Sequence, residues 1–282
     1  QLTDDKDVQN TFSSWLYRRS GLILFTGLTG SGKTTTLYSL LKLVRGKTIY
    51  SIEDPIEVVQ DNIIQLEVND RIGFGYDEGI KQILRHNPDI IMIGEIRDGE
   101  TASIAVQASI TGHLVVSTLH TNDTASSVTR LLDMGVESYL IADSTVGIIA
   151  QRLVRRLCPN CKKERPVMDY EADYLELSAK DRARQVIFEP VGCQRCNGTG
   201  YYGRIGIYEI MEITPRLRGM IARKSPTDAL RQAALEEGML TLKQSARRLV
   251  LDGTTAISEM QAITVEDNDE AVANPHNAEE TE

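Results

Sequence analysis

Short apolar runs alternate with longer segments of helical period along the first half of the chain. Such runs are typical of strands buried on both faces of a parallel sheet, and the segments between them are typical of covering helices. The pattern therefore predicts an α/β fold. The expected strands are Leu22–Thr26, Thr48–Ile52, Ile63–Val68, Ile90–Ile93 and Leu114–Thr118, and the expected helices are Lys33–Val44, Glu78–His86, Glu100–Ser109, Ala125–Leu132 and Tyr139–Gly147.

The alternation ends near residue 150, where basic residues, cysteines, glycines and tyrosines replace it. A helical period returns from Pro226 to Ala262. This change in the residue pattern predicts an α/β core over residues 1–150, a cysteine-containing module over 151–212 and a C-terminal helical subdomain over 213–263.

The charge of the chain is concentrated at its end. The 282 residues carry a net charge of -9, but residues 264–282 contain seven acids and no Lys or Arg, which leaves -2 for the rest. A segment so acidic and without aromatic residues buries too little surface to fold, so we expect a disordered acidic tail over 264–282. No broad basic face is indicated, and we expect no nucleic-acid partner.

The length of the apolar runs also indicates whether the chain could cross a membrane. Leu22 to Phe25 and Ile90 to Ile93 are far shorter than the roughly 20 residues that a spanning helix needs, so we expect no direct membrane insertion. The chain begins with Gln1 and has no leader of signal-peptide type, and we interpret it as an excised part of a cytosolic protein.

The segment Gly27–Thr34 fits the P-loop pattern of Gly, four residues, Gly, Lys, Thr, between a predicted strand and a predicted helix. Backbone N–H groups of such a loop and the helix N-terminus cradle phosphates. Lys33 is expected to reach the β and γ phosphates of ATP, and the Thr34 hydroxyl to hold Mg2+. The candidate nucleotide-binding residues are Gly27, Leu28, Thr29, Gly30, Ser31, Gly32, Lys33, Thr34 and Thr35.

Two acids follow predicted strands and complement the P-loop. Glu95 follows the apolar run Ile90–Ile93, and Glu53 follows the strand that ends at Ile52. Strand C-termini form the edge at which open α/β sheets build their sites. A single acid in such a position is usually a cap or a solvated turn residue, but two of them in one P-loop domain favour catalytic roles for Glu53 and Glu95.

Histidines bracket the strand Leu114–Thr118. His120 follows this strand, on the same edge as Glu95, where an imidazole could sense the γ phosphate of a nucleotide. His113 precedes the strand and is the weaker candidate.

Four cysteines form two C-x-x-C pairs, Cys158–Cys161 and Cys193–Cys196. Two such knuckles complete the tetrahedral sulfur shell of a structural Zn2+ site and leave no position for water. The 31 residues between the pairs exceed the usual spacing of about 15 to 20, which predicts a helical insert near Tyr170–Ala183. Redox-active dithiols and two local disulfides are the alternatives.

Five ordered segments together resemble the ATPases of type II secretion and type IV pilus assembly, over nearly all of Leu2 to Ile263. Leu28 stands where that family commonly has Pro, and few arginines precede Asn87. The matching segments are Gly27–Thr34 (Walker A), Ile52–Glu57 (Asp box), Gly94–Asp98 (Walker B), Thr118–Asn122 (His box) and Gln151–Cys158 (before the first cysteine pair).

This resemblance implies a RecA-like motor in a homohexamer, cytoplasmic and peripheral to the inner membrane, without the family's N-terminal domains. It implies ATP hydrolysis that drives an inner-membrane platform protein, with a membrane-recruitment protein as a further partner. Arg85 and Arg97 remain candidates for phosphate or inter-subunit contacts. Secretion, pilus extension and DNA uptake share this core, so the motifs are compatible with all three.

Two other classes of protein remain open at this stage. One is a P-loop DNA translocase or helicase whose cysteine module binds nucleic acid, with Arg152, Arg155 and Arg156 on phosphates. The other is a nucleotide-binding scaffold without catalysis. Stimulation of hydrolysis by nucleic acid distinguishes the first, and turnover by the full protein distinguishes the second.

Overall fold

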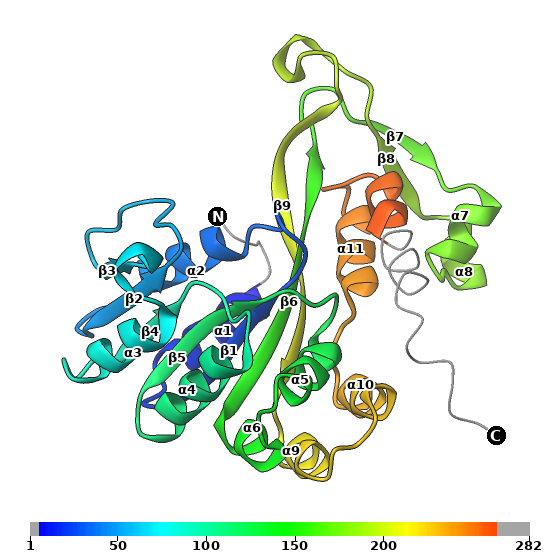
Figure 1. Cartoon of the computed structure of the whole chain (residues 1–282). Helices are drawn as coiled ribbons and strands as arrows, with labels where there is room; N and C mark the ends of the chain where they lie inside the picture. Colours follow the sequence, from blue (N-terminus) through cyan, green and yellow to red (C-terminus); the bar gives the residue numbers. More distant parts are fainter. Residues whose placement is uncertain (1–5, 264–282) are drawn as a thin grey trace. The chain divides into compact units, whose positions relative to one another are not determined.

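A seven-stranded sheet organises the computed structural model, which describes residues 6–263 (Figure 1). Its strands are β1 (Gly21–Thr26), β2 (Ile49–Glu53), β3 (Ile64–Glu67), β4 (Ile90–Ile93), β5 (Leu114–Leu119), β6 (Thr145–Leu157) and β9 (Tyr201–Glu212). They lie in the order β3-β2-β4-β5-β1-β6-β9, and every pair from β3 to β6 is parallel. The C-terminal ends of β1, β2, β4 and β5 therefore meet at one edge.

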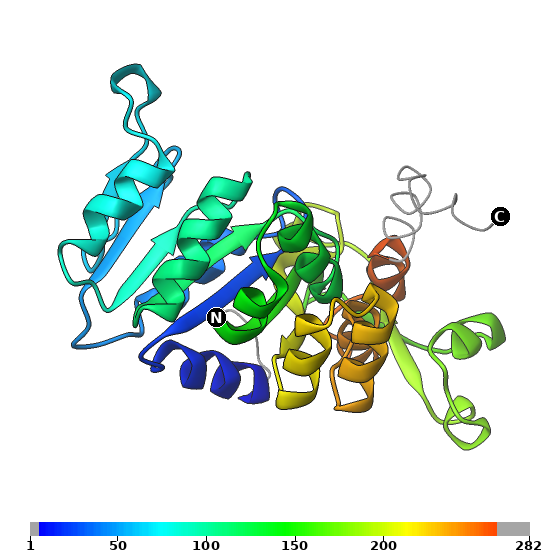
Figure 2. The same ribbon diagram turned by 60° about the horizontal axis from the view of Figure 1, so that its bottom comes forward.

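Apolar side chains alternate between the two faces of this sheet. Leu22 and Leu24 belong to one buried cluster, whereas Ile23 and Phe25 belong to the other. Figures 1 and 2 show helices on both faces. The first cluster packs beneath α3 (Tyr76–Leu84), α4 (Gly99–Ile110), α5 (Thr124–Asp133), α6 (Ser138–Ser144), α9 (Pro215–Ala222) and α10 (Thr227–Glu236), and the second beneath α1 (Lys6–Leu16) and α2 (Lys33–Leu41).

The α/β fold predicted from the apolar pattern is confirmed. The five predicted strands match the observed ones within one residue at each end, and the first four predicted helices are present. The fifth prediction, a helix over Tyr139–Gly147, is wrong in its second half, because α6 ends at Ser144 and β6 begins at Thr145. β-branched residues and Gly147 favour the extended chain there.

Helix α1 was not predicted, and its position depends on one glycine. Trp15 of α1 is buried against β6, where a Cβ on Gly147 would lie 2.0 Å from an atom of the indole ring. Any side chain at Gly147 would therefore displace α1 from the sheet.

The cysteine-containing part of the chain has its own secondary structure. Strands β7 (Lys163–Pro166) and β8 (Val186–Glu189) pair antiparallel and enclose α7 (Asp169–Tyr174) and α8 (Ala179–Arg182). The predicted insert between the cysteine pairs is thus present as two short helices rather than one. The short 3-10 helices η1 (Asp70–Ile72) and η2 (Gln194–Cys196) and helix α11 (Leu242–Leu251) complete the secondary structure.

Two compact units result, with boundaries that differ from the domains expected from the sequence. One contains the described residues up to Arg152 together with Tyr208–Met239, and the other contains Leu153–Ile207 together with the described residues from Leu240 onward. Residues 213–263 are divided between the units because α9 and α10 contribute Leu217, Ile221 and Leu230 to the core beneath α3 to α6.

Among residues 6–263, no helix has the length and apolar composition that crossing a bilayer requires. The acidic tail expected over 264–282 lies outside the described residues.

Candidate functional site

The loop Gly27–Thr34 connects the fully buried strand β1 to α2, as the motif predicts. Gly27 has a φ of 143°, and a Cβ there would lie 2.5 Å from the carbonyl oxygen of Gln151. Gly32 precedes α2 with a φ of 86°, in the left-handed region that glycine adopts without strain. The glycines therefore allow the loop to curl tightly over the end of β1.

Lys33 is buried at the start of α2. Its Nζ donates hydrogen bonds to the carbonyl oxygens of Gly27 (2.6 Å) and Leu28 (3.1 Å). Burial lowers the pKa of Lys33 to about 8, although the negative charge of Glu95 opposes this shift. A phosphate next to this ammonium group would restore its affinity for the proton.

Glu53 ends β2 and is 3% exposed. Its Oε1 accepts hydrogen bonds from Ser51 Oγ (2.5 Å) and Gln65 Nε2 (3.0 Å), and its Oε2 accepts one from the Tyr38 hydroxyl. Both oxygens of this carboxylate are therefore held by neutral donors from α2, β2 and β3.

Glu95 follows β4 and has charged partners instead. It pairs with Arg97, and its Oε2 lies 3.3 Å from His120 Nε2. Burial alone would raise the pKa of Glu95, but Arg97 and His120 together hold it below its ordinary value. Arg97 also reaches Asp54 Oδ2 at 3.3 Å. Glu95 is thus an ionised carboxylate beside a guanidinium and an imidazole.

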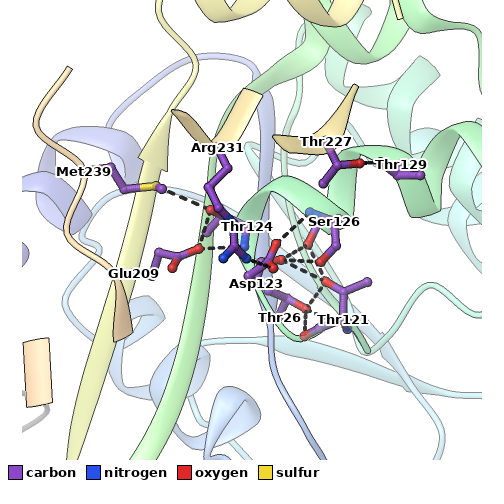
Figure 3. Close-up of polar contacts among 11 residues, drawn as sticks. Thr26, Thr121, Asp123, Thr124, Ser126, Thr129, Glu209, Thr227, Arg231 and Met239 are labelled. Atoms are coloured by element: carbon purple, nitrogen blue, oxygen red, sulfur yellow. Dashed lines mark hydrogen bonds and ion pairs between the residues drawn. The ribbon is translucent and has the colours of Figure 1, made fainter. Parts of the chain in front are cut away.

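The chain that follows His120 is tied to the base of the P-loop (Figure 3). Thr26 is fully buried, and its Oγ1 accepts the Thr121 N–H (2.9 Å) and lies 2.7 Å from the Thr121 carbonyl oxygen. Two residues later, Asp123 accepts the Ser126 N–H at the start of α5 and pairs with an arginine of α10, Arg231. These contacts fix the position of His120 relative to Gly27.

Thr26→Val should therefore disturb the placement of His120 without changing the size of the side chain. Loss of the hydroxyl leaves the Thr121 N–H without its partner, which should cost about 1–3 kcal/mol of unfolding free energy. Chemical denaturation of the two proteins measures this cost. Thr26→Ser keeps the hydroxyl and should stay closer to the original stability, and equal losses in both variants would contradict the role of the hydrogen bond.

The remaining candidates lie elsewhere. His113 precedes β5, and its Nδ1 lies 3.2 Å from the Ala108 carbonyl oxygen. Arg85 is exposed directly after α3, at the end where β4 begins. Among the described residues, no hydrogen bond or ion pair joins Arg85 to the P-loop, Glu53 or Glu95. Only Arg97 of the two arginine candidates lies beside a candidate carboxylate.

The four cysteines form one cluster. Their sulfur atoms all lie within 4.8 Å of one another, with Sγ separations of 3.9 Å for Cys158–Cys193, 3.8 Å for Cys161–Cys196 and 3.7 Å for Cys193–Cys196. None of the four forms a disulfide, so the geometry gives no support to local disulfides. Burial opposes ionisation of Cys196, but backbone N–H groups of Cys193 and Gly200 lower its pKa to about 6.

Sequence reasoning placed His120 on the same edge as Glu95, but it did not identify the donors around Glu53 or the residues that hold the P-loop and the chain after His120. Tyr38, Ser51 and Gln65 hold Glu53, while Gln151 donates to the Ser31 carbonyl oxygen at 2.8 Å and Thr26 holds the chain after His120. One signal was available: Tyr38 stands four residues after Thr34, on the same face of α2.

A P-loop at the end of a parallel sheet, with acids after two neighbouring strands, defines a P-loop protein of the α/β class. The family of type II/IV secretion system proteins matches residues 1–262, and the chain belongs to that family. The resemblance recognised from the five motifs is therefore confirmed.

Named relatives agree with this assignment. The type IV pilus assembly ATPase TfpB of Acinetobacter baylyi is 45% identical over 262 residues, covering 92% of this chain and 45% of that protein. Type II secretion system protein E of Aeromonas hydrophila is 42% identical over 261 residues, covering 92% of this chain and 52% of that protein. The chain spans about half the length of these relatives.

Solved structures agree as well. The pilus retraction motor PilT with bound ADP is 26% identical, with a TM-score of 0.68, and the match covers 93% of this chain and 65% of that one. The ATPase DotB of Legionella pneumophila is 20% identical, with a TM-score of 0.67 over 94% of this chain and 64% of that one, and supports the fold alone.

Proposed function

We propose that the chain is an ATP-hydrolysing motor domain that powers assembly of type IV pili or of a type II secretion pseudopilus, with a competence pilus as a variant of the same task. The observation that carries the proposal is the convergence of Lys33, Glu53 and Glu95 at one edge of the sheet. A pilus assembly ATPase and a secretion protein E among the relatives support the pathway.

The proposed chemistry follows from this arrangement. Residues Gly27–Thr35 bind the nucleotide, Lys33 meets the β and γ phosphates, and the Thr34 hydroxyl holds Mg2+. Magnesium supplies neutralisation of phosphate charge when it is bound. Glu53 and Glu95 divide the work of orienting the attacking water and holding the metal, and His120, in contact with Glu95, senses the γ phosphate.

Arg97 and Arg85 have different places in this proposal. Arg97 bridges Glu95 and Asp54 and can turn toward an incoming phosphate. Arg85, exposed at the opposite end of α3 from Tyr76, is suited only to a contact with a neighbouring subunit.

We also propose that Cys158, Cys161, Cys193 and Cys196 hold one Zn2+. A tetrahedral shell with zinc–sulfur bonds of about 2.3 Å has edges of about 3.8 Å. Three of the sulfur separations, 3.7 to 3.9 Å, fit that shell, and all four sulfur atoms lie within 4.8 Å of one another. With four protein ligands the ion supplies structure rather than catalysis.

The assembly belongs to the same proposal. It is a homohexamer of RecA-like cores at the cytoplasmic face of the inner membrane, acting on a platform protein and held there by a membrane-recruitment protein. Residues 1–150 form the core, 151–212 the zinc module and 213–263 a helical subdomain, whose α9 and α10 pack against the core.

The alternative, a DNA translocase, is weakened by the surroundings of its proposed phosphate contacts. Arg155 pairs with Glu259 at 2.7 Å and stacks over the ring of Tyr201, and Arg152 is buried. A guanidinium engaged in this way has few N–H groups left to bind the phosphates of a nucleic-acid backbone.

The full protein encoded by the gene should hydrolyse ATP at a rate that neither single- nor double-stranded DNA raises. Steady-state phosphate release with and without DNA, at two salt concentrations, measures this. Because phosphate contacts make binding strongly salt-dependent, a several-fold stimulation that disappears at high salt would favour the translocase instead. Absence of any ATP hydrolysis would favour a scaffold without catalysis.

A further inference from the structure

Tyr38 links the P-loop helix to the buried carboxylate of Glu53. It lies on α2 four residues after Thr34, so both side chains project from the same face of that helix. Tyr38 is 5% exposed, and its hydroxyl donates to Glu53 Oε2. The helix that carries Lys33 and Thr34 therefore has a direct contact with the end of β2.

The other oxygen of Glu53 has its own donors. Ser51 Oγ lies 2.5 Å and Gln65 Nε2 lies 3.0 Å from Oε1. Gln65 is itself fixed, because its Nε2 also lies 3.2 Å from the Val58 carbonyl oxygen and its Oε1 accepts the Gln60 N–H at 2.7 Å. Ser51 and Gln65 belong to β2 and β3. Of these three donors, Tyr38 is therefore the one that connects Glu53 to the P-loop helix α2.

The Tyr38 hydroxyl keeps its proton. Burial, followed by the hydrogen bond to Glu53 and the charge of that carboxylate, raises the pKa of Tyr38 well above its ordinary value. The phenol therefore keeps, near neutral pH, the proton that it donates to Glu53 Oε2.

We infer that Tyr38 is a positioning residue, which orients the Glu53 carboxylate toward the phosphates held by the P-loop. This inference rests on the proposed ATPase function. A carboxylate that orients water must be held to within a fraction of an ångström, and an error of about 1 Å can cost roughly 100-fold in rate. Ser51 and Gln65 hold Glu53 within the sheet, and Tyr38 fixes its distance from α2.

The test compares Tyr38, a buried tyrosine of α2, with Tyr208, a buried tyrosine that contacts α2. Tyr38→Phe removes the hydroxyl that reaches Glu53, whereas Tyr208→Phe removes a buried hydroxyl that bonds Thr36 of the same helix. In the full protein, Tyr38→Phe should lower kcat by roughly 10- to 100-fold with little change in ATP affinity. Tyr208→Phe should keep kcat within about two-fold of the original, because it leaves Glu53 untouched.

Combination with the carboxylate variants separates positioning from a general structural effect. In a Glu53→Gln background, Tyr38→Phe should cause no further fall in turnover, because the residue it positions is already lost. In a Glu95→Gln background the full fall should persist. An equal fall in both backgrounds, or a loss confined to ATP affinity, would overturn the inference.

The outcome also distinguishes this inference from the proposed function. If the original protein hydrolyses ATP and the Tyr38→Phe variant does so equally fast, the role of Tyr38 is overturned and the proposed function stands. If the original protein does not hydrolyse ATP, both are overturned.

Discussion

Glu53→Gln and Glu95→Gln should each leave ATP binding nearly intact while slowing turnover by about 100- to 1,000-fold. Glutamine keeps the size and hydrogen-bonding capacity of the side chain but removes the negative charge. Phosphoryl transfer demands little covalent chemistry of a protein, so its rate depends on the placement of water and on charge around the γ phosphate. Steady-state hydrolysis and nucleotide affinity, measured on the full protein, test both variants.

Lys33→Ala is the contrasting variant in the same experiment. Lys33 meets the phosphates in the ground state as well as during reaction, so its loss should weaken nucleotide affinity itself. Near-original turnover in both glutamate variants would show that the catalytic carboxylates lie elsewhere. A selective loss of affinity in the glutamate variants would assign them to binding rather than to chemistry.

Replacement of one cysteine, Cys196→Ser, should release zinc and unfold the cysteine module. Structural zinc contributes about 10–16 kcal/mol of apparent binding free energy in small zinc domains, so such a module depends on its metal. Elemental analysis of carefully reduced protein should give about one zinc per chain before the change and much less after it. Limited proteolysis should then cut the module first.

Asn160→Ser is a matched control for the cysteine variant. Asn160 is exposed between Cys158 and Cys161 and contacts Arg195 rather than a sulfur atom, so this variant should keep its zinc. Nucleotide affinity should survive in Cys196→Ser, because the P-loop and its sheet have a separate core. Reduced protein that contains no metal at all would contradict the zinc proposal.

The sequence predicted those parts of the fold whose signal is local. Strands such as Ile90–Ile93 are buried on both faces, so their apolar character is continuous and visible. Strand β6 was not predicted at all. Its first residues, such as Val146 and Ile148, follow a helical segment directly, without a turn signal. The place of α1 depends on contact between Trp15 and Gly147, residues far apart in the sequence.

The position of the candidate carboxylates was predictable to the extent that the ends of the strands reveal it. Glu53 and Glu95 were identified because each follows an apolar run, and parallel strands bring such ends to one edge. The surroundings of Glu53 were not predictable. Its neutral donors come from α2, β2 and β3, which no local pattern connects, whereas His120 was expected on the same edge as Glu95.

The two cations of this site already have partners within the chain. Lys33 is bound to carbonyl oxygens of its own loop, and Arg97 bridges Glu95 and Asp54. On the proposed function, a nucleotide phosphate would compete with the neutral loop carbonyl oxygens for Lys33, and Mg2+ would compete with Arg97 for Glu95. Binding of one component alone would break such contacts with only part of the compensation, so we expect the site to favour the metal–nucleotide complex over either component alone.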